Sequence, residues 1–304
     1  MTTIGWMRGS AHQGSHQGRT AMQTTAEGMT AERMTIKERQ IQGKLDSDRC
    51  EDGIAANEHF IAVVDGSTSK TNLTIRSGMS NGRLCMELIC RYIEDMPADI
   101  TIEDFCKGVT DAVAAEYRAA GIDRERLRES PTDRMTASVI VYSKFRREIW
   151  MVGDCQCFID GLHYDNPKPY EREIAEERAL ILTKALANGA TEEELRDDDI
   201  GRKAILPKLK AACKGQNVVY PVVDGFPIPT PLVKLISVGK GLHDIVLASD
   251  GYPQLKPTLR ESEEALSRLL TEDPLCIRMN VATKGLARGH QSFDDRTFVR
   301  FAAG

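Results

Sequence analysis

The side chains of this sequence best suited to chemistry are acids that directly follow apolar runs. Asp65 closes the run Phe60–Val64, and Asp250 follows Ile245–Ser249. Both precede a glycine, and Asp-Gly is favoured in β-turns for ordinary backbone reasons. A carboxylate at the edge of an apolar strand is nevertheless costly unless it is paired or bound to a cation. These two positions therefore need an explanation beyond a turn.

Two acidic pairs, Glu51-Asp52 and Asp294-Asp295, lie in a similar setting beside apolar segments. If all four groups meet, their repulsion requires a counter-charge. Oxygen ligands without an accompanying His or Cys cluster suit Mg²⁺ or Mn²⁺. Two such ions about 4 Å apart can activate a shared water and hold phosphoryl oxygens. The spacing alone leaves such a metal site and ordinary solvated turns equally open.

Short segments rich in Val and Ile predict the strands that would position these acids. They span residues 36–42, 59–64, 136–142, 148–152, 155–159, 232–238, 244–248 and 296–301. The stretch 136–160 predicts consecutive antiparallel strands, with turns near Arg146 and at Gly153-Asp154. Helical spacing of apolar residues predicts helices over 84–93, from Thr101, over 262–270 and over 274–286.

The order of these elements predicts an α+β fold with antiparallel sheets in the middle and helices outside. Residues 161–231 are the least regular segment, with a charged helix from Thr191 and the acidic run Asp197–Asp199, which suggests a solvated helix end. We expect this segment to be a flap inserted in one domain that spans residues 34–304. Residues 1–33 are polar without apolar periodicity and predict a mobile tail.

Composition excludes several classes of protein. The chain has 304 residues, of which 41% are hydrophobic and 28% charged, so a disordered or membrane-embedded chain is disfavoured. The net charge of −5 argues against a nucleic-acid partner. Eight scattered cysteines and the lack of a secretory apolar core favour reduced thiols and a cytoplasmic location. The oligomeric state is not decided by the sequence.

Six short motifs occur in an order that resembles one protein family. They are Glu51-Asp52, Val63–Gly66, Thr136–Ser138, Val152–Asp154, Leu247–Gly251 and Asp294–Thr297. In this order they resemble the type 2C metal-dependent serine/threonine protein phosphatases (the PPM family), from about residue 36 to the end of the chain. The resemblance implies a β-sandwich of two antiparallel sheets flanked by helices, with metals in a cleft at one end.

The resemblance also implies a role for each acid. Asp65 would bridge two Mn²⁺ or Mg²⁺ ions, and the Gly66 carbonyl would bind one of them. Asp250 and Asp294 would complete the other, while Glu51 and Asp52 would act near the metals, partly through water. A water activated by the two metals would then attack the phosphorus of a phosphoserine or phosphothreonine in a phosphoprotein.

The chain departs from the family at three points. Ser67–Lys70 follows the first Asp-Gly where the family often has His or Met-Gly-Gly, so the general acid is unassigned. Lys44 and Arg49 are the candidates for the family's phosphate-binding arginine, and Asp133 is the nearest candidate for a third metal ligand. These departures leave a rival hypothesis: a binding module that keeps the fold without turnover.

A second rival is a serine hydrolase. Gly78–Gly82 reads Gly-Met-Ser-Asn-Gly and matches the GxSxG motif around a nucleophile, here Ser80. That motif needs a hydrophobic strand that ends at its first glycine, whereas residues 71–77 are mostly polar. A loop that caps the following helix is the favoured interpretation.

Overall fold

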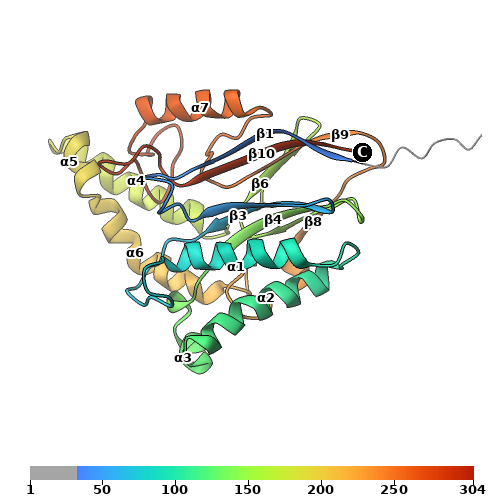
Figure 1. Cartoon of the computed structure of the whole chain (residues 1–304). Coiled ribbons are helices and arrows are strands. Elements are labelled where there is room, and N and C mark those ends of the chain that lie inside the picture. The colour runs from blue at the N-terminus through green and yellow to red at the C-terminus, as the bar shows by residue number, and fades with distance from the viewer. Residues whose placement is uncertain (1–32) are drawn as a thin grey trace, which may run out of the picture. The chain divides into compact units, whose positions relative to one another are not determined.

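Two antiparallel five-stranded sheets face each other in the computed structural model, which describes residues 33–304 (Figure 1). The strand orders are β1-β10-β9-β6-β7 and β2-β3-β4-β5-β8. Helices flank the outer faces of both sheets. The α+β fold with two antiparallel sheets and flanking helices, predicted from the sequence, is confirmed. The tail predicted over residues 1–33 lies outside the described residues except for Arg33.

The first sheet contains the strand nearest each end of the described chain. Its strands are β1 Met34–Gln42, β10 Arg296–Ala303, β9 His243–Ala248, β6 Gln156–Ile159 and β7 Leu162–Tyr164. The second sheet consists of β2 Asp52–Ala56, β3 Phe60–Gly66, β4 Ala137–Ser143, β5 Glu148–Val152 and β8 Lys234–Ser237. Every predicted strand is present, and β2 and β7 are additional.

The antiparallel run predicted over residues 136–160 is correct only for β4 and β5. These two strands pair with each other, but β6 belongs to the other sheet and pairs with β7 and β9. The chain changes sheets at Gly153, whose φ is +100° and where a Cβ would lie 2.2 Å from the Ser138 hydroxyl. A side chain is excluded there for both reasons.

Strand β3 explains why its sequence is apolar without alternation. Ile61 and Val63 pack in the core between the two sheets, while Phe60, Ala62 and Val64 pack in the core under the helices. A strand buried on both faces is expected to be a continuous apolar run. The helices on this side are α1 Asn81–Asp95, α2 Ile102–Ala119 and the short α3 Arg124–Glu129.

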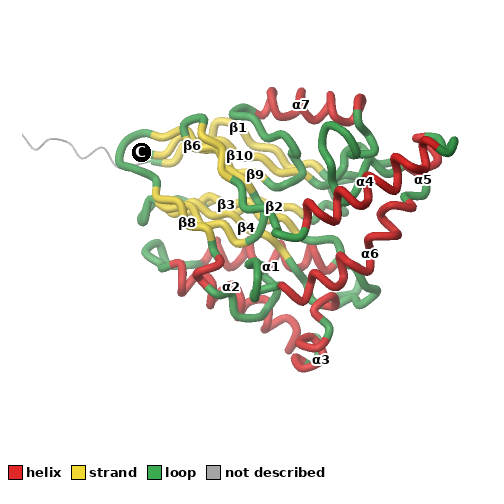
Figure 2. Tube along the Cα trace, turned by 180° about the vertical axis from the view of Figure 1, so that it is seen from behind, coloured by secondary structure: helices red, strands yellow, loops and turns green. Residues whose placement is uncertain are grey.

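The insertion is more regular than predicted. It contains α4 Glu171–Ala187, α5 Glu192–Asp197 and α6 Ile200–Ala212, which lie together at the end of the sandwich opposite the C-terminus (Figures 1 and 2). Thr191 forms a capping box with Glu194 at the start of α5, so the predicted charged helix is present. The acidic run Asp197–Asp199 ends α5 and caps α6, and it is therefore structural rather than only solvated.

The helix predicted over residues 274–286 is not formed. The Asp273 carboxylate accepts hydrogen bonds from the backbone N–H groups of residues 277–280, which removes the donors that a helix would use. Cys276 has a φ of +52°, which also breaks a helix. We call residues 273–286 the anchored loop. The other predicted C-terminal helix is present as α7 Leu259–Glu272.

Short 3₁₀ turns complete the structure at Pro131–Asp133, Cys213–Gly215 and Thr230–Leu232. Between residues 33 and 304, no helix has both the length and the apolar character needed to cross a membrane.

Candidate active site

Acids from four separate segments meet at the end of the sandwich that carries the insertion. Asp52 begins β2 and lies directly opposite Asp65, near the end of β3. Asp154 follows β5 at the change of sheet, and Asp250 follows β9. Asp65 feels the charges of the other three. We call Asp52, Asp65, Asp154 and Asp250 the acidic cluster.

Two members of the cluster, Asp52 and Asp65, behave electrostatically as buried carboxylates that lack a counter-charge. Burial, with Asp52 and Asp250 as further contributors, raises the pKa of Asp65 well above its ordinary value. Burial, together with Asp295 and Asp250, raises the pKa of Asp52 to about 7. The neighbouring Asp250 carboxylate contributes to the raised pKa of Asp65 both through its charge and as a hydrogen-bonding neighbour. A bound cation would favour the ionised forms.

The donor set fits a hard divalent cation. Both carboxylate oxygens of Asp52 are buried and accept no hydrogen bond of normal geometry, although the Ser249 and Thr297 side chains lie close to them. A ligand would satisfy these oxygens. Oxygen donors without thiolate or imidazole are the set that Mg²⁺ and Mn²⁺ take. Across residues 33–304, however, no three His, Cys, Asp or Glu side chains are already gathered as a closed metal site. The types of donor atom in the cluster therefore suit these cations, but the side chains are not arranged as a complete coordination shell.

Gly66 is held close to the cluster by backbone packing. Its N–H donates to the Glu51 carbonyl at 3.0 Å. A Cβ at this position would lie 2.3 Å from the Gly82 carbonyl oxygen and 2.6 Å from that of Glu51. Only glycine therefore lets β3 approach the start of α1 this closely.

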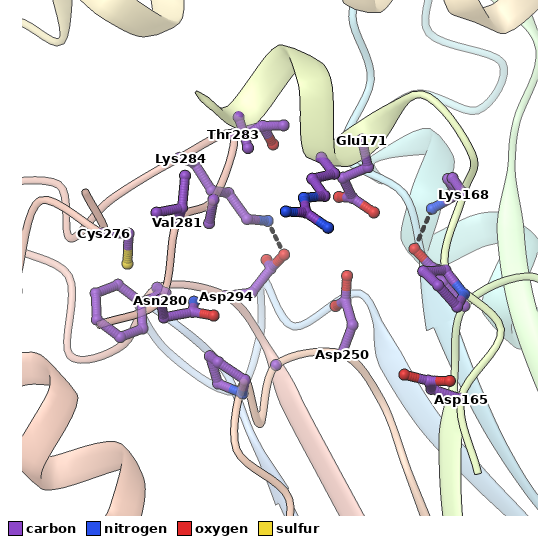
Figure 3. Close-up of a pocket in the computed structure, with 18 of the residues that line it drawn as sticks. Asp165, Lys168, Glu171, Asp250, Cys276, Asn280, Val281, Thr283, Lys284 and Asp294 are labelled. Atoms are coloured by element: carbon purple, nitrogen blue, oxygen red, sulfur yellow. Dashed lines mark hydrogen bonds and ion pairs between the residues drawn. The ribbon is translucent and has the colours of Figure 1, made fainter. Parts of the chain in front are cut away.

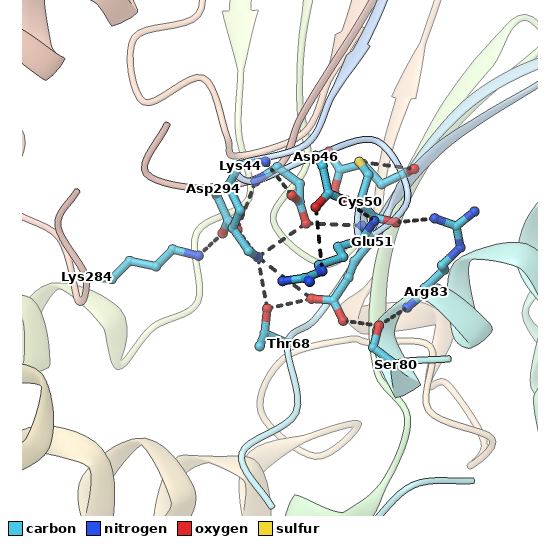
Figure 4. Close-up of polar contacts among 12 residues, drawn as sticks. Lys44, Asp46, Cys50, Glu51, Thr68, Ser80, Arg83, Lys284 and Asp294 are labelled. Carbon is cyan, nitrogen blue, oxygen red and sulfur yellow. Dashed lines mark hydrogen bonds and ion pairs between the residues drawn. The ribbon is translucent and has the colours of Figure 1, made fainter. Parts of the chain in front are cut away.

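Asp294 faces two lysines (Figure 4), and Asp295 pairs with one of them. The Lys44 ammonium lies 2.9 Å from Asp294, 3.2 Å from Asp295 and 3.8 Å from Glu51. Lys284 forms a second ion pair with Asp294. The structure thus places Lys44 beside the acids and adds Lys284, a lysine that the sequence did not point to. Phosphate binding by Lys44 stays a prediction.

Ser80 caps a helix. Its hydroxyl donates to a Glu51 carboxylate oxygen at 2.6 Å and accepts from the Arg83 N–H at 3.3 Å, at the start of α1. Within the described chain, no histidine makes a hydrogen bond to Ser80. The second Glu51 oxygen accepts from the Thr68 hydroxyl at 2.6 Å. Ser80 and Thr68 therefore fix the orientation of the buried Glu51 carboxylate.

Arg49 and Asp133, which the resemblance suggests for the site, contact residues outside it. The Arg49 side chain is 73% exposed, and its guanidinium lies 3.6 Å from Asp46 in the same loop. Asp133 pairs with Arg126 at 3.5 Å. The structure brings neither residue into contact with the acidic cluster.

A cavity of about 480 Å³ opens beside the acids (Figure 3). Asp154, Asp250 and Asp294 line one side of it. The other walls come from the loop before α4, which carries Lys168, from Glu171 at the start of α4, and from residues 276–284 of the anchored loop. The insertion therefore forms part of the cavity that leads to the candidate metal ligands.

Lys168 and Lys284 are the residues that sequence reasoning missed. Lys168 pairs with the buried Asp154, and this pairing outweighs the cost of burial and lowers the pKa of Asp154. Neither lysine belongs to a recognisable motif: Lys168 lies in a loop without apolar periodicity, and Lys284 lies in a segment whose apolar spacing predicts a helix. Asp154 itself stands in one of the six family motifs, so that motif was the available signal for its place in the cluster.

One prediction concerns the stability of the metal-free protein. The pKa of Asp52 is raised from 3.8 to about 7 in the folded protein. Because the folded state holds this proton more tightly than the unfolded state, the protein is more stable at low pH, and this advantage is lost as the pH rises from about 4 through about 7. Asp52→Asn removes this ionisation and should stabilise the metal-free protein at pH 8 by roughly 2–4 kcal/mol. Thermal unfolding in chelator at pH 5 and pH 8 measures the effect.

The matched control is Asp48→Asn, an exposed acid in the neighbouring loop. We expect it to leave the pH dependence of the melting temperature unchanged. Equal pH dependence of wild type and Asp52→Asn would contradict the assignment of a raised pKa to Asp52.

The chain is similar to known proteins in its structure but not detectably in its sequence. No protein-family profile matches the chain, and no curated protein matches it. Solved structures do match. The serine/threonine phosphatase PstP/Ppp of Mycobacterium tuberculosis is 15% identical, with 88% of this chain and 98% of that chain covered and a TM-score of 0.42.

Two further structures are similar to the same extent. The catalytic domain of PstP in complex with two manganese ions is 13% identical, with 90% and 98% covered and a TM-score of 0.45. The PPM Ser-Thr phosphatase MsPP of Mycobacterium smegmatis is 16% identical, with 90% and 99% covered and a TM-score of 0.43. Because these identities and TM-scores are low, the function is inferred from this chain's own residues. The solved structures to which the chain is similar are serine/threonine phosphatases of the PPM type.

Proposed function

We propose that this protein is a metal-dependent phosphatase of the type 2C class that hydrolyses phosphoserine and phosphothreonine in proteins. The observation that carries the proposal is the acidic cluster. Asp52, Asp65 and Asp250 come from separate motifs and meet beside an open cavity, and both oxygens of the buried Asp52 carboxylate accept no hydrogen bond of normal geometry. A site of this composition is suited to two divalent cations and a phosphoryl group.

Asp65, the Gly66 carbonyl, Asp250 and Asp294 would hold the metals, with the Glu51-Asp52 pair nearby. When bound, two Mn²⁺ or Mg²⁺ ions would supply an activated water and neutralise the phosphoryl charge. Asp294 would have to exchange at least one of its lysine partners for a metal.

The chain's own residues prepare the site for a phosphoprotein. The hydrogen bonds from Ser80 and Thr68 hold Glu51 in one orientation, so this carboxylate is fixed before any ligand arrives. Lys44 places a positive charge beside the acids, where a phosphoryl group would be attracted. With a volume of about 480 Å³, the cavity would have room for a phosphorylated side chain. A cytoplasmic location stays a prediction.

The test is hydrolysis of p-nitrophenyl phosphate and of a phosphothreonine peptide by the full chain. We expect turnover with Mn²⁺ and its loss in chelator, with recovery when Mn²⁺ is returned. Hydrolysis that is insensitive to chelator would contradict the proposal. Calorimetric Mn²⁺ binding without turnover on either substrate would favour the binding module.

The serine hydrolase makes a different prediction for Ser80. Because Ser80 caps α1 and bonds to Glu51, Ser80→Ala should lower stability by about 1 kcal/mol and hydrolysis by less than ~10-fold. Loss of a nucleophile would cost ~10⁶-fold. Steady-state kinetics with Mn²⁺ and thermal unfolding measure the two effects.

Thr101→Ala is the matched control, since Thr101 caps α2 through the same kind of bond and contacts none of the acids of the site. It should lower stability similarly and leave hydrolysis unchanged. Loss of all activity in Ser80→Ala alone would point to a serine nucleophile.

A further inference from the structure

The anchored loop is fixed in place by arginines of the insertion. The Arg178 guanidinium donates to the Leu275 carbonyl at 2.9 Å and to the Ala282 carbonyl at 3.0 Å. Arg202 donates to the Thr283 carbonyl at 2.9 Å, and Arg196 donates to the Leu286 carbonyl at 3.2 Å. Within the loop, the Leu286 N–H donates to the Pro274 carbonyl at 2.7 Å. The backbone on both sides of Lys284 is therefore held by hydrogen bonds.

Gly285 shows how closely this part of the loop is packed. A Cβ there would lie 2.9 Å from the carbonyl oxygens of Pro274 and Leu275, and 3.0 Å from the Arg178 guanidinium. The residue after Lys284 thus has no room for a side chain. The direction in which Lys284 leaves the loop is determined by this packing.

The Lys284 side chain extends into the cavity toward Asp294 (Figure 3). It is 40% exposed, whereas Asp294 is 17% exposed. The Lys284 side chain is therefore more accessible from the solvent than the carboxylate with which it pairs. Asp250 lines the same cavity.

Lys44 and Lys284 approach Asp294 from different directions (Figure 4) but differ in how firmly they are held. Lys44 also bonds to Asp295 at 3.2 Å and to the Thr68 hydroxyl at 3.1 Å, and it is 17% exposed. The ion pair recorded for Lys284 in the described chain is the one with Asp294. Since a single carboxylate does not need two ammonium groups, Lys284 is the one available to a ligand.

We propose that Lys284 binds phosphoryl oxygens of the substrate in the cavity, and this rests on the proposed phosphatase function. A lysine ammonium is a compact charge with three rotatable donors, so it can leave Asp294 for a phosphate dianion without a change in the backbone. The anchored loop and the insertion present it. Lys284 then contributes to the phosphate binding for which Lys44 and Arg49 were the sequence candidates.

The test compares Lys284→Met with Lys284→Arg and with the control Lys208→Met. Lys208 lies on α6, pairs with Glu177 and is 55% exposed, so it matches the change in charge away from the cavity. Inorganic phosphate binding to the Mn²⁺-loaded protein is measured by calorimetry, and Mn²⁺ binding is measured in the same way. We expect Lys284→Met to weaken phosphate binding by ~10- to 100-fold, with KM for p-nitrophenyl phosphate raised in parallel.

Lys284→Arg should recover most of the phosphate affinity, because it restores the charge, and Lys208→Met should behave as wild type. If Lys284→Met leaves phosphate binding unchanged and only tightens Mn²⁺ binding, Lys284 merely neutralises Asp294 and the proposal is wrong. Phosphate binding does not require turnover. A wild-type protein that binds phosphate through Lys284 but hydrolyses no phosphomonoester would therefore contradict the phosphatase function and leave this inference standing.

Discussion

Asp65→Asn is expected to lower Mn²⁺-dependent kcat/KM by at least ~10³-fold without unfolding the protein. Asp65 lies near the end of β3, opposite Asp52 and in contact with Asp250. Asparagine has nearly the same shape but lacks the negative charge that a divalent cation requires. The raised pKa of Asp65 means that the ionised carboxylate costs stability in the metal-free protein. The substitution should therefore not reduce stability in chelator.

Two measurements accompany the kinetics. Mn²⁺ should raise the melting temperature of wild type by mass action and should have little effect on Asp65→Asn. Asp160→Asn is the matched control, because Asp160 also precedes a glycine but forms a turn and bonds to His243 at 2.7 Å. It should leave both hydrolysis and the Mn²⁺ effect intact. Hydrolysis in Asp65→Asn within tenfold of wild type would contradict the role assigned to Asp65.

The acids could be predicted from the sequence because local signals mark them. Asp65 and Asp250 each follow a short apolar run rich in β-branched residues, which predicts a buried strand. Antiparallel pairing then brings such strand ends together. The register of β2 against β3 places Asp52 opposite Asp65. β2 was itself missed because its five residues, Asp-Gly-Ile-Ala-Ala, carry too short an apolar pattern.

The lysines could not be predicted, since tertiary contacts place them. Lys284 lies in a segment whose spacing predicts a helix, beginning at Pro274 and ending before Gly289. The helix does not form because the Asp273 carboxylate accepts hydrogen bonds from the N–H groups of residues 277–280. In addition, the Leu275 carbonyl accepts from the guanidinium of Arg178, which lies in a helix almost a hundred residues earlier. No local pattern contains that information.

Helix α4 was missed for a related reason. Its buried residues do not form one stripe, because Ile174 packs with Ile205 and Leu209 while Leu182 packs with Leu195 and Leu275. A helix that is buried against two separate clusters shows a weak amphipathic pattern. The insertion therefore seemed irregular in sequence although it is helical.

The second prediction with a large expected effect concerns the contribution of Arg178 to the stability of the fold. Its side chain is fully buried on α4, and its guanidinium donates twice to Asp199 at 2.9 and 2.7 Å. It also donates to the carbonyls of Leu275 and Ala282 in the anchored loop. Removing it leaves buried carbonyl groups without a donor and Asp199 without its cation. Since Asp199 is partly exposed and can be hydrated, Arg178→Met should cost about 3 kcal/mol rather than more.

For a domain of this size, a loss of about 3 kcal/mol lowers the melting temperature by roughly 6 °C or more. Arg172→Met on the same helix is the matched control, because Arg172 is 90% exposed and its ion pair in the described chain is with Glu176. It should leave the melting temperature essentially unchanged. Arg178→Lys should not rescue, since a point charge cannot reach the carboxylate and both carbonyls at once. If Arg178→Met melted within a degree of wild type, the insertion would not hold the anchored loop, and the position of Lys284 would need another cause.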